Sequence, residues 1–210
     1  MELWKWSYPN SQLVKLGSSA SSLTCPYKFR DAKFRGTRLI QLGESGEYDK
    51  INIHAYDECA FRWSCGHGHI QIANWLIQLG DSGKYGKIDM HAYDEVAFRY
   101  SCTNAHMQIA NRLIQLGESG EYGKINIHAC GEWAFRHSCE NGHIQIACWL
   151  IQLGESWEYG KINIHAYDEY AFKHSCANGH IQIANWLIHL GQSGKYGKID
   201  QMIIDKYIKN

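Results

Sequence analysis

The sequence predicts an all-α repeat protein, in which short helix-turn-helix units stack into a solenoid. Three observations lead to this fold class. First, the motif I-x-x-H-A-x-x-E-x-A-F-(R/K)-x-S-C recurs every 37 residues, and periods of about 20 to 50 residues are typical of stacked repeats. Second, each repeat divides at glycines into two stretches with helical periodicity. Third, neither stretch can bury its apolar face alone, so the units must pack on one another.

The unit boundaries follow from a second repeated segment that ends each time in Leu-Gly. Four complete units span residues 44–80, 81–117, 118–154 and 155–191. Residues 38–43 keep an older copy of the same ending, so we interpret residues 1–43 as one or two degenerate units that form an N-terminal cap. Residues 192–210 start a truncated fifth unit, and we expect them to fold over the last complete unit as a partial C-terminal cap.

The first helix of each unit has one apolar face. In unit 1 this face carries Ala60, Phe61, Ser64 and Cys65, which we expect to be buried. Asp57 precedes them as a predicted N-cap, and Glu58 places negative charge in the first turn, where the helix dipole favours it. Gly68 ends the helix, because glycine readily adopts the left-handed conformation of a C′ position.

The second helix starts near His69. Its inward positions are Ile72, Ala73, Leu76, Ile77 and Leu79. Trp75 is replaced by Arg112 in the next unit, so this position must be partly exposed. After the second helix, residues 87–91 alternate apolar and polar side chains behind a glycine-containing turn, which predicts a β-hairpin-like finger loop.

The segment at residues 64–80 resembles the ankyrin-repeat core A-A-x-x-G-H-x-x-(I/V)-V-x-x-L-L-x-x-G, and the match repeats in register through all four units. The family's T-P-L-H helix start appears here as residues 59–62, and the unit is longer than usual. The D-E-x-A-F start, the N-G-H turn and the 37-residue length resemble the ankyrin proteins encoded by giant DNA viruses of amoebae. The resemblance implies an ankyrin-type solenoid of helix pairs with projecting fingers, which acts as a protein-binding platform.

Composition argues against several other classes of function. The formal net charge is zero, whereas binding to nucleic acid backbones needs clustered Lys and Arg. The N-terminus lacks the apolar stretch of a signal peptide, and no apolar run is long enough to span a membrane. We therefore expect a cytoplasmic protein, in the host cytoplasm if it is viral. The sequence contains no hydrolase, nucleotide-binding or dinucleotide-binding motif, so we expect no catalytic residues, no cofactor and no enzyme activity.

Two ladders of histidines recur at equivalent positions in all units. A catalytic group is normally unique, so we interpret these rings as structural, bonded to loop backbone and holding neighbouring units in register. No three or four ligands converge by spacing, so we expect no metal site. One ladder, at the fingers, contains His54, His91, His128 and His165, and the other, at the second helices, contains His69, His106, His143 and His180.

The repeated cysteines and charges also receive structural interpretations. Equivalent positions in stacked helices lie about 8–10 Å apart, which is too far for a disulfide, so Cys65, Cys102, Cys139 and Cys176 are expected to be small buried side chains. Each first helix carries an acid four residues before a base, beginning with Glu58 and Arg62. This spacing predicts i,i+4 ion pairs, each adding about 0.2–0.5 kcal/mol.

The positions that differ between copies predict where a partner binds. The fold fixes the repeated positions, so a binding site is sought among those that vary, on one stripe of the first helix together with the finger tips. In ankyrin proteins these elements line the concave face. The predicted partner-binding residues are Tyr56, Trp63, His67, Tyr93, Tyr100, Asn104, Trp133, His137, Asn141, Tyr167, Tyr170 and His174. The alternative is that the stripe is inter-unit packing whose members vary to fit one another.

Three irregular positions carry predictions of their own. Ala105 replaces a turn glycine and should be strained, Gly131 replaces the predicted capping Asp and should weaken its helix slightly, and Trp157 replaces a loop glycine. We interpret Trp157 as a lid on its neighbour or as a partner contact. The resulting functional hypothesis is a non-catalytic scaffold that binds a host protein. The alternatives are an adaptor that recruits targets to a ubiquitin ligase, or a decaying member of an expanded repeat family without a specific partner.

Overall fold

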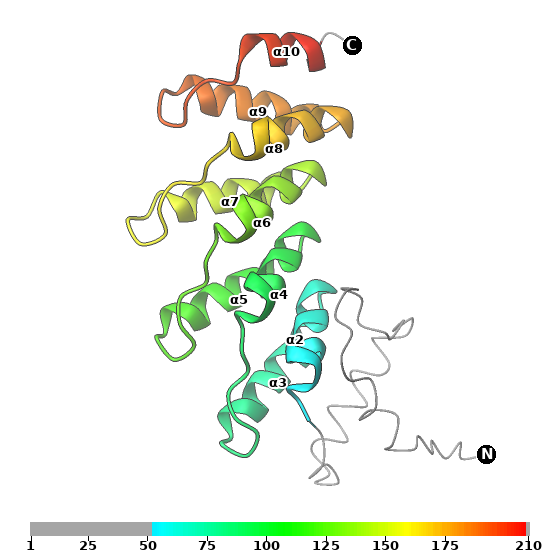
Figure 1. The fold of residues 1–210 in the computed structure, drawn as a ribbon, viewed down its shortest axis with the longest axis vertical. Helices are drawn as coiled ribbons and strands as arrows, with labels where there is room; N and C mark the ends of the chain where they lie inside the picture. The colour runs from blue at the N-terminus through cyan, green and yellow to red at the C-terminus, as the bar shows by residue number, and fades with distance from the viewer. Residues whose placement is uncertain (1–51, 209–210) are drawn as a thin grey trace, which may run out of the picture. The chain divides into compact units, whose positions relative to one another are not determined.

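The computed structural model describes residues 52–208, which form nine helices and no strand. Each predicted unit contributes a first and a second helix (Figure 1). The predicted N-terminal cap, residues 1–43, lies outside the described residues. The pairs are α2 (Ala55–Gly66) and α3 (Ile70–Asp81), α4 (Ala92–Thr103) and α5 (Met107–Glu118), α6 (Ala129–Glu140) and α7 (Ile144–Gly154), and α8 (Ala166–Ala177) and α9 (Ile181–Gln192), followed by α10 (Gln201–Ile208).

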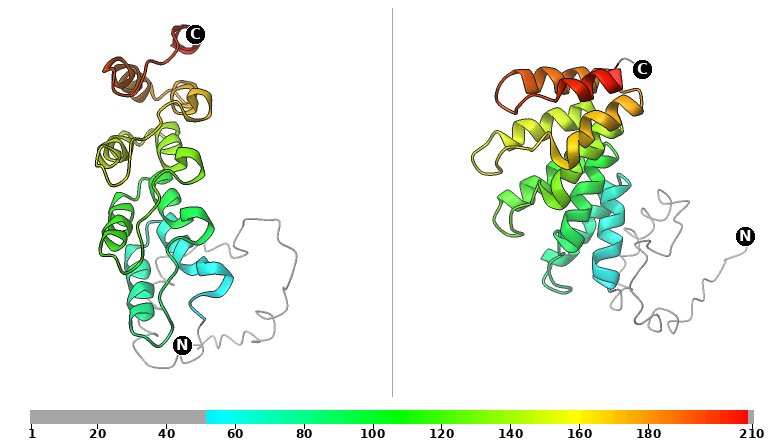
Figure 2. Two further views of the ribbon diagram at one scale, coloured as in Figure 1. Left: turned by 60° about the vertical axis from the view of Figure 1, so that its left-hand side comes forward. Right: turned by 45° about the horizontal axis from the view of Figure 1, so that its top comes forward.

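The helices form two layers (Figure 2). The first helices α2, α4, α6 and α8 pack side by side along one layer, and each second helix packs against the first helix of its own unit. Neighbouring first helices approach one another more closely than neighbouring second helices do. The prediction of an all-helical repeat is therefore confirmed. No helix in the described part of the chain is long and apolar enough to cross a membrane.

The loops between units contain no β-hairpin in the described residues. After α3, a turn at residues 82–85 leads into residues 86–89, which have no regular secondary structure. The predicted alternation of side chains is present, because Ile88 and Met90 are buried whereas Lys87 and Asp89 are exposed. Two alternate side chains therefore reach the core without any strand pairing.

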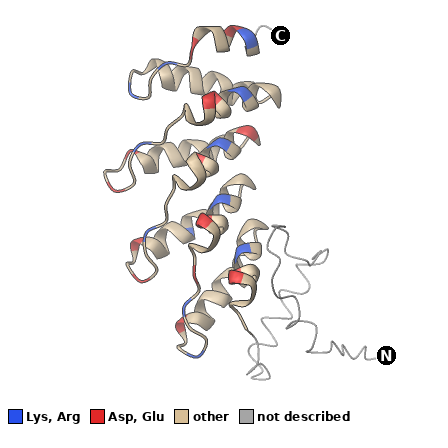
Figure 3. Cartoon of the chain, viewed as in Figure 1, with Lys and Arg blue, Asp and Glu red and all other residues tan. Residues whose placement is uncertain are grey.

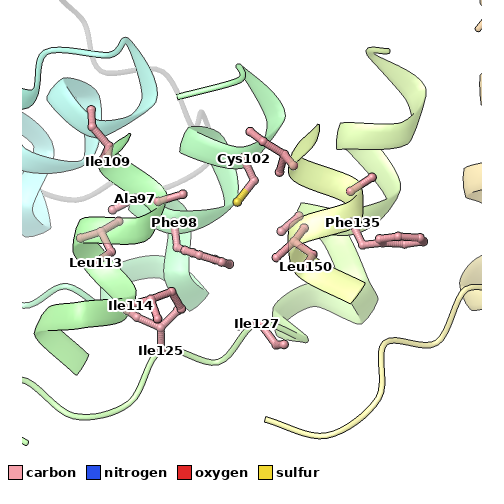
Figure 4. Close-up of a cluster of buried hydrophobic side chains, with 14 of the residues drawn as sticks. Ala97, Phe98, Cys102, Ile109, Leu113, Ile114, Ile125, Ile127, Phe135 and Leu150 are labelled. Carbon is pink, nitrogen blue, oxygen red and sulfur yellow. The ribbon is translucent and has the colours of Figure 1, made fainter. Parts of the chain in front are cut away.

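A ladder of phenylalanines forms the core of the stack. Phe61, Phe98, Phe135 and Phe172 are completely buried, one in each unit. Figure 4 shows Phe98 and Phe135 among aliphatic side chains from first helices, second helices and loops. Truncation of such a side chain to Ala typically costs about 3–5 kcal/mol, so the repeated A-F pair is a main source of stability.

The tryptophans of the second helices reach back over these phenylalanines. Trp149 lies 6.3 Å from Phe98 between ring centroids, and Trp186 lies 6.3 Å from Phe135. Arg112 stands where this pattern would place a tryptophan over Phe61, and a small hollow of about 10 Å³ lies beside both residues. These tryptophans are half-buried, as the substitution by Arg112 predicts.

The turn between the two helices of a unit adopts the predicted left-handed conformation. Gly68, Gly142 and Gly179 have φ of 79°, 82° and 76°. Ala105 at the same position has φ of 63°, so an L-residue keeps the glycine geometry. The predicted strain at Ala105 therefore has its structural basis, since this region disfavours a Cβ by about 1–2 kcal/mol.

The last helix, α10, packs against α8 as a partial cap. Ile203, Ile204 and Tyr207 are half-buried against the core, whereas Met202 and Ile208 stay exposed. Three of the five apolar side chains of α10 therefore pack against the core.

Candidate functional site

Each complete first helix begins with a left-handed turn. Tyr56, Asp57 and Glu58 have φ of 55°, 51° and 62°, and the equivalent residues of the other units share this conformation. Each L-residue held there costs about 1–2 kcal/mol, so side-chain contacts must stabilise the turn. The prediction that Asp57 is an N-cap is wrong, because it lies inside this turn and the helix has no side-chain cap.

The first histidine ladder provides one set of side-chain contacts that stabilise the left-handed turn. Nδ1 of His54 lies 2.6 Å from Oε1 of Glu58, and Nε2 lies 2.7 Å from the carbonyl oxygen of Tyr85. The same Glu58 oxygen accepts a hydrogen bond from the amide of Asp89, 3.2 Å away. A buried carboxylate and a histidine thus fix the turn and join unit 1 to the loop of unit 2.

The same arrangement occurs in the other complete units. His91, His128 and His165 contact Glu95, Glu132 and Glu169 at 2.8, 2.9 and 2.6 Å. Their Nε2 atoms lie 2.7–2.8 Å from the carbonyl oxygens of Tyr122, Tyr159 and Tyr196. The helix α10 has Met202 and Lys206 where these units have His and Glu, and it has no left-handed turn. The turn therefore accompanies the His and Glu pair.

The pKa of these histidines is raised by the pair. For His54 the hydrogen bond with Glu58 is the largest cause. For His91 burial is the largest cause and lowers the pKa, but the hydrogen bonds to Glu95 and to the Tyr122 carbonyl and the charges of Glu95 and Asp89 all raise it, and the net direction is upward. His128 and His165 follow His91. Both ring nitrogens favour carrying a proton.

The arginines form the second set of contacts. Nε of Arg62 donates to the carbonyl oxygen of Asp57 at 2.6 Å, and Nη2 donates to that of Tyr56 at 2.8 Å. Arg99 and Arg136 do the same in their units and are buried. Figure 3 shows the alternating acidic and basic positions along the first helices.

The prediction of i,i+4 ion pairs between these acids and bases is wrong. Glu58 turns to His54, and Arg62 turns to the carbonyl oxygens of the left-handed turn. The turn reverses the expected geometry, because it moves the acid away from the helical face that carries the base. In the last complete unit Lys173 pairs with the carboxylate of Asp168 at 2.5 Å.

The prediction that Gly131 weakens its helix is also wrong. Gly131 lies inside a left-handed turn with φ of 61°, where glycine is the most favourable residue. The ring of Tyr167 covers it so closely that any Cβ at residue 131 would collide with that ring.

Four tyrosines of the predicted site, on the left-handed turns and first helices, are exposed. We call Tyr56, Tyr93, Tyr100 and Tyr167 the tyrosine row. Their exposed fractions are 42%, 46%, 43% and 67%. The Tyr93 ring lies 4.2 Å from the Arg62 guanidinium and its hydroxyl donates to Asp57 at 2.9 Å, whereas the Tyr167 ring lies 4.0 Å from the Arg136 guanidinium.

Other predicted partner-binding residues pack on one another. Trp133 stacks on His137 and Tyr170 stacks on His174, each at 3.9 Å. His137 lies 5.3 Å from Tyr170 in the next unit, and Trp133 lies 6.5 Å from Tyr100 in the preceding unit. These positions thus contribute to inter-unit packing, as the alternative interpretation predicts.

The polar members of the predicted site bond to the backbone. Nδ2 of Asn104 donates to the carbonyl oxygen of Gly66 at 2.7 Å, and Nδ2 of Asn141 donates to that of Thr103 at 3.1 Å. His67 stacks on Trp63 at 3.9 Å and contacts its carbonyl oxygen through Nδ1. The two asparagines therefore link consecutive units at the helix turn.

The second histidine ladder lies at this same end of the first helices. A Cβ at Gly68 would lie 2.7 Å from the ring of His106, and a Cβ at Gly142 would lie 2.7 Å from that of His180. The ring of one unit therefore covers the glycine turn of the unit before it. The pKa values of His69, His106 and His143 are lowered, first by burial and then by neighbouring histidines.

The repeated cysteines are mostly buried thiols. Cys65, Cys102 and Cys139 are free and fully buried, and burial raises the pKa of each thiol. Cys176 is free and half-buried in the last complete unit. Within residues 52–208, no three His, Cys, Asp or Glu side chains come together as potential metal ligands.

Trp157 is 92% exposed on a loop and covers no neighbour, so it is not a lid. No protein-family model matches the sequence, and a search of curated proteins finds no match.

Sequence reasoning missed the left-handed turn. A signal was present, since the fixed spacing of His54, Glu58 and Arg62 repeats in each unit, with Lys173 in place of the arginine in the last. That spacing is equally compatible with a regular right-handed helix. Only the backbone dihedral angles show that the three side chains stabilise a left-handed turn.

Proposed function

We propose that the chain is an ankyrin-type scaffold that binds a protein partner and has no catalytic activity of its own. The tyrosine row is the main contact surface in this proposal. One observation supports this surface most strongly. The rings of Tyr93 and Tyr167 are exposed to solvent and are also held in place by contact with an arginine guanidinium group.

The energetics of recognition support a row of fixed tyrosines. Tyrosine offers a large contact area with few rotatable bonds, and its hydroxyl provides a hydrogen bond. Binding is strengthened when the side chain is already ordered before the partner arrives, because less conformational entropy is lost. The guanidinium groups of Arg62 and Arg136 are themselves held by two backbone carbonyls.

The position of the row also supports the proposal. The first helices pack directly on one another, which supports the proposal that they form the inner side of the stack, where an extended partner can contact several units. Tyr56, Tyr93 and Tyr167 recur at one position of the repeat, so their spacing follows the stack. Cys130 takes this place in the third unit and leaves a gap in the row.

The ankyrin-type assignment has support from local structure. Two short helices, a turn in the left-handed conformation and a histidine after that turn occur in each complete unit, and the turn residue is glycine in three units and Ala105 in the other. These features agree with the resemblance of residues 64–80 to the ankyrin core. As the resemblance implies, the proposal extends to a host protein as partner and the cytoplasm as compartment.

The experiment compares two triple variants of the full chain. Tyr56, Tyr93 and Tyr167 are changed to Ser in one, and the exposed Gln71, Gln108 and Gln145 of the second helices are changed to Ala in the other. A partner captured from host lysate with the unaltered protein is purified, and its affinity is measured by calorimetry.

We expect the tyrosine variant to bind at least about tenfold more weakly, which corresponds to about 1.4 kcal/mol, and the glutamine variant to bind normally. Circular dichroism verifies that both variants are folded. Equal binding by a folded tyrosine variant would refute the proposed surface.

A further inference from the structure

The two histidine ladders occupy opposite ends of the first helices. His54, His91, His128 and His165 precede these helices and contact the loops of the following units. His69, His106, His143 and His180 follow them and start the second helices. Both ladders lie at inter-unit contacts, so a change in their charge acts on the coupling between units.

The first ladder has acceptors at both ring nitrogens. Nε2 of His128 faces the carbonyl oxygen of Tyr159 at 2.7 Å, and a carbonyl can only accept. Nδ1 faces both oxygens of Glu132, at 2.9 and 3.0 Å. An ionised carboxylate also only accepts, so the ring makes both bonds when it carries two protons and a positive charge.

Loss of this charge would leave a buried acid without its counter-charge. Glu58, Glu95, Glu132 and Glu169 are buried. The second carboxylate oxygens of Glu58, Glu95 and Glu169 have no hydrogen-bond partner. The acid of the same turn is the principal charge facing each ring, and Asp89 in the loop also faces His91. Breaking a buried ion pair is strongly destabilising because the remaining charge is uncompensated.

The second ladder has the opposite surroundings. His106 faces His67, His69 and His143, and His143 faces His180. The titratable groups that face it are other histidines. Protonation would therefore place like charges in a row over the glycine turns, where the rings are packed closely.

We propose that the two ladders make the coupling between units depend on pH in opposite directions, so that the stack is held most firmly near the ordinary titration point of histidine. Alkaline conditions weaken the contacts between the first histidine ladder and the loops of the following units. Acidic conditions weaken the contacts between the second histidine ladder and the glycine turns. This pH dependence is a property of the scaffold itself and does not require a bound partner.

The direction of each effect follows from proton linkage. The first ladder has a raised pKa in the folded state, so its stabilisation is complete below about pH 6.5 and is lost as pH rises through the folded pKa. His69, His106 and His143 of the second ladder have a lowered pKa, so their stabilisation is present above about pH 6.5 and is lost as pH falls through the folded pKa. Each proton difference changes the unfolding equilibrium up to about tenfold per pH unit.

Nitrogen-15 NMR of the imidazole rings in the full chain tests the first ladder directly. At pH 6.5 we expect His54, His91, His128 and His165 to be mainly doubly protonated, and His69, His106 and His143 to be mainly neutral. Mainly neutral rings in the first ladder at pH 6.5 would overturn the proposal, and this result needs no variant.

Urea unfolding between pH 5 and 9 tests the consequence. We expect a maximum of stability near pH 6.5 in the unaltered protein. A double variant with Glu95→Gln and Glu132→Gln should lose much of the alkaline decline, and one with His106→Gln and His143→Gln should lose much of the acidic decline. Retention of the full alkaline decline in a folded Glu variant, or of the full acidic decline in a folded His variant, would contradict the proposal.

The matched control is His189→Gln. His189 is exposed on α9, and the equivalent positions of the other units are Gln78, Gln115 and Gln152. We expect this variant to keep both limbs of the profile, and a loss of either limb would show that histidine count, not ladder position, sets the pH dependence. If a Glu variant fails to fold, the NMR result on the unaltered chain still decides.

Discussion

Replacement of Ala105 by Gly should stabilise the protein. Ala105 has φ of 63° at a position where the other complete units have glycine. The left-handed region costs an L-residue about 1–2 kcal/mol, and glycine loses about 0.5–1 kcal/mol more backbone entropy on folding than Ala. The difference predicts a gain of about 0.5–1 kcal/mol, which corresponds to an increase in Tm of about 1–4 °C for a chain of this size.

The reverse substitutions separate backbone strain from side-chain collision. Gly142→Ala introduces a Cβ that lies 2.7 Å from the ring of His180, whereas Gly179→Ala introduces one with no atom within 4 Å. Both residues have nearly the same φ. We expect Gly179→Ala to cost about 0.5–1 kcal/mol from the backbone alone, and Gly142→Ala to cost about 1–3 kcal/mol more from overpacking.

Urea unfolding of the three variants at pH 7 measures these differences. An unchanged or lowered free energy of unfolding for Ala105→Gly would refute the assignment of strain to this turn. Equal losses for Gly142→Ala and Gly179→Ala would instead refute the proposed contact between the second histidine ladder and the glycine turns.

Two further predictions concern packing along the stack. Arg112→Trp should fill the hollow over Phe61 and restore the pattern of the other units, with a gain of about 0.5–1.5 kcal/mol from the aromatic pair; thermal unfolding checks this, and a lower Tm would show that the hollow cannot accept the ring. Arg136→Lys should lose one of two charged hydrogen bonds to backbone carbonyls and cost about 1.5–3 kcal/mol; unchanged stability in urea would show that the arginine does not hold the left-handed turn.

Most of the fold could be predicted from the sequence because its signals are repeated. Four copies of one apolar pattern identify the helix pairs, and the burial of Phe61, Phe98, Phe135 and Phe172 confirms the inward face. The glycine turn was predictable for the same reason, since φ at Ala105 and at the glycines agrees.

The left-handed turn could not be predicted, because its residues look like an ordinary helix start. Asp57 is favourable at an N-cap and Glu58 is favourable in a first turn, so local preferences predict that both interact with the backbone of an ordinary helix start. The deciding contacts come from the next unit, where the Tyr85 carbonyl and the Asp89 amide hold His54 and Glu58.

The candidate site was only partly visible in the sequence. Variation between copies marks packing residues, whereas the exposed tyrosines of the left-handed turns recur at one position of the repeat. The aromatic side chains at Trp133 and Tyr170 vary because they fit neighbouring rings, whereas those at Tyr93 and Tyr167 remain exposed. Exposure separates the two groups, and exposure depends on three-dimensional packing.

The central claim is that a protein partner contacts the first-helix side of the stack through the tyrosine row. Site-specific photo-cross-linking tests it most directly, with a photoreactive phenylalanine derivative placed at residue 93 or, as the matched control, at the exposed residue 108 on α5. We predict that the captured partner cross-links from residue 93 and not from residue 108. Cross-linking from residue 108 alone would contradict the account, because it would place the partner on the second helices.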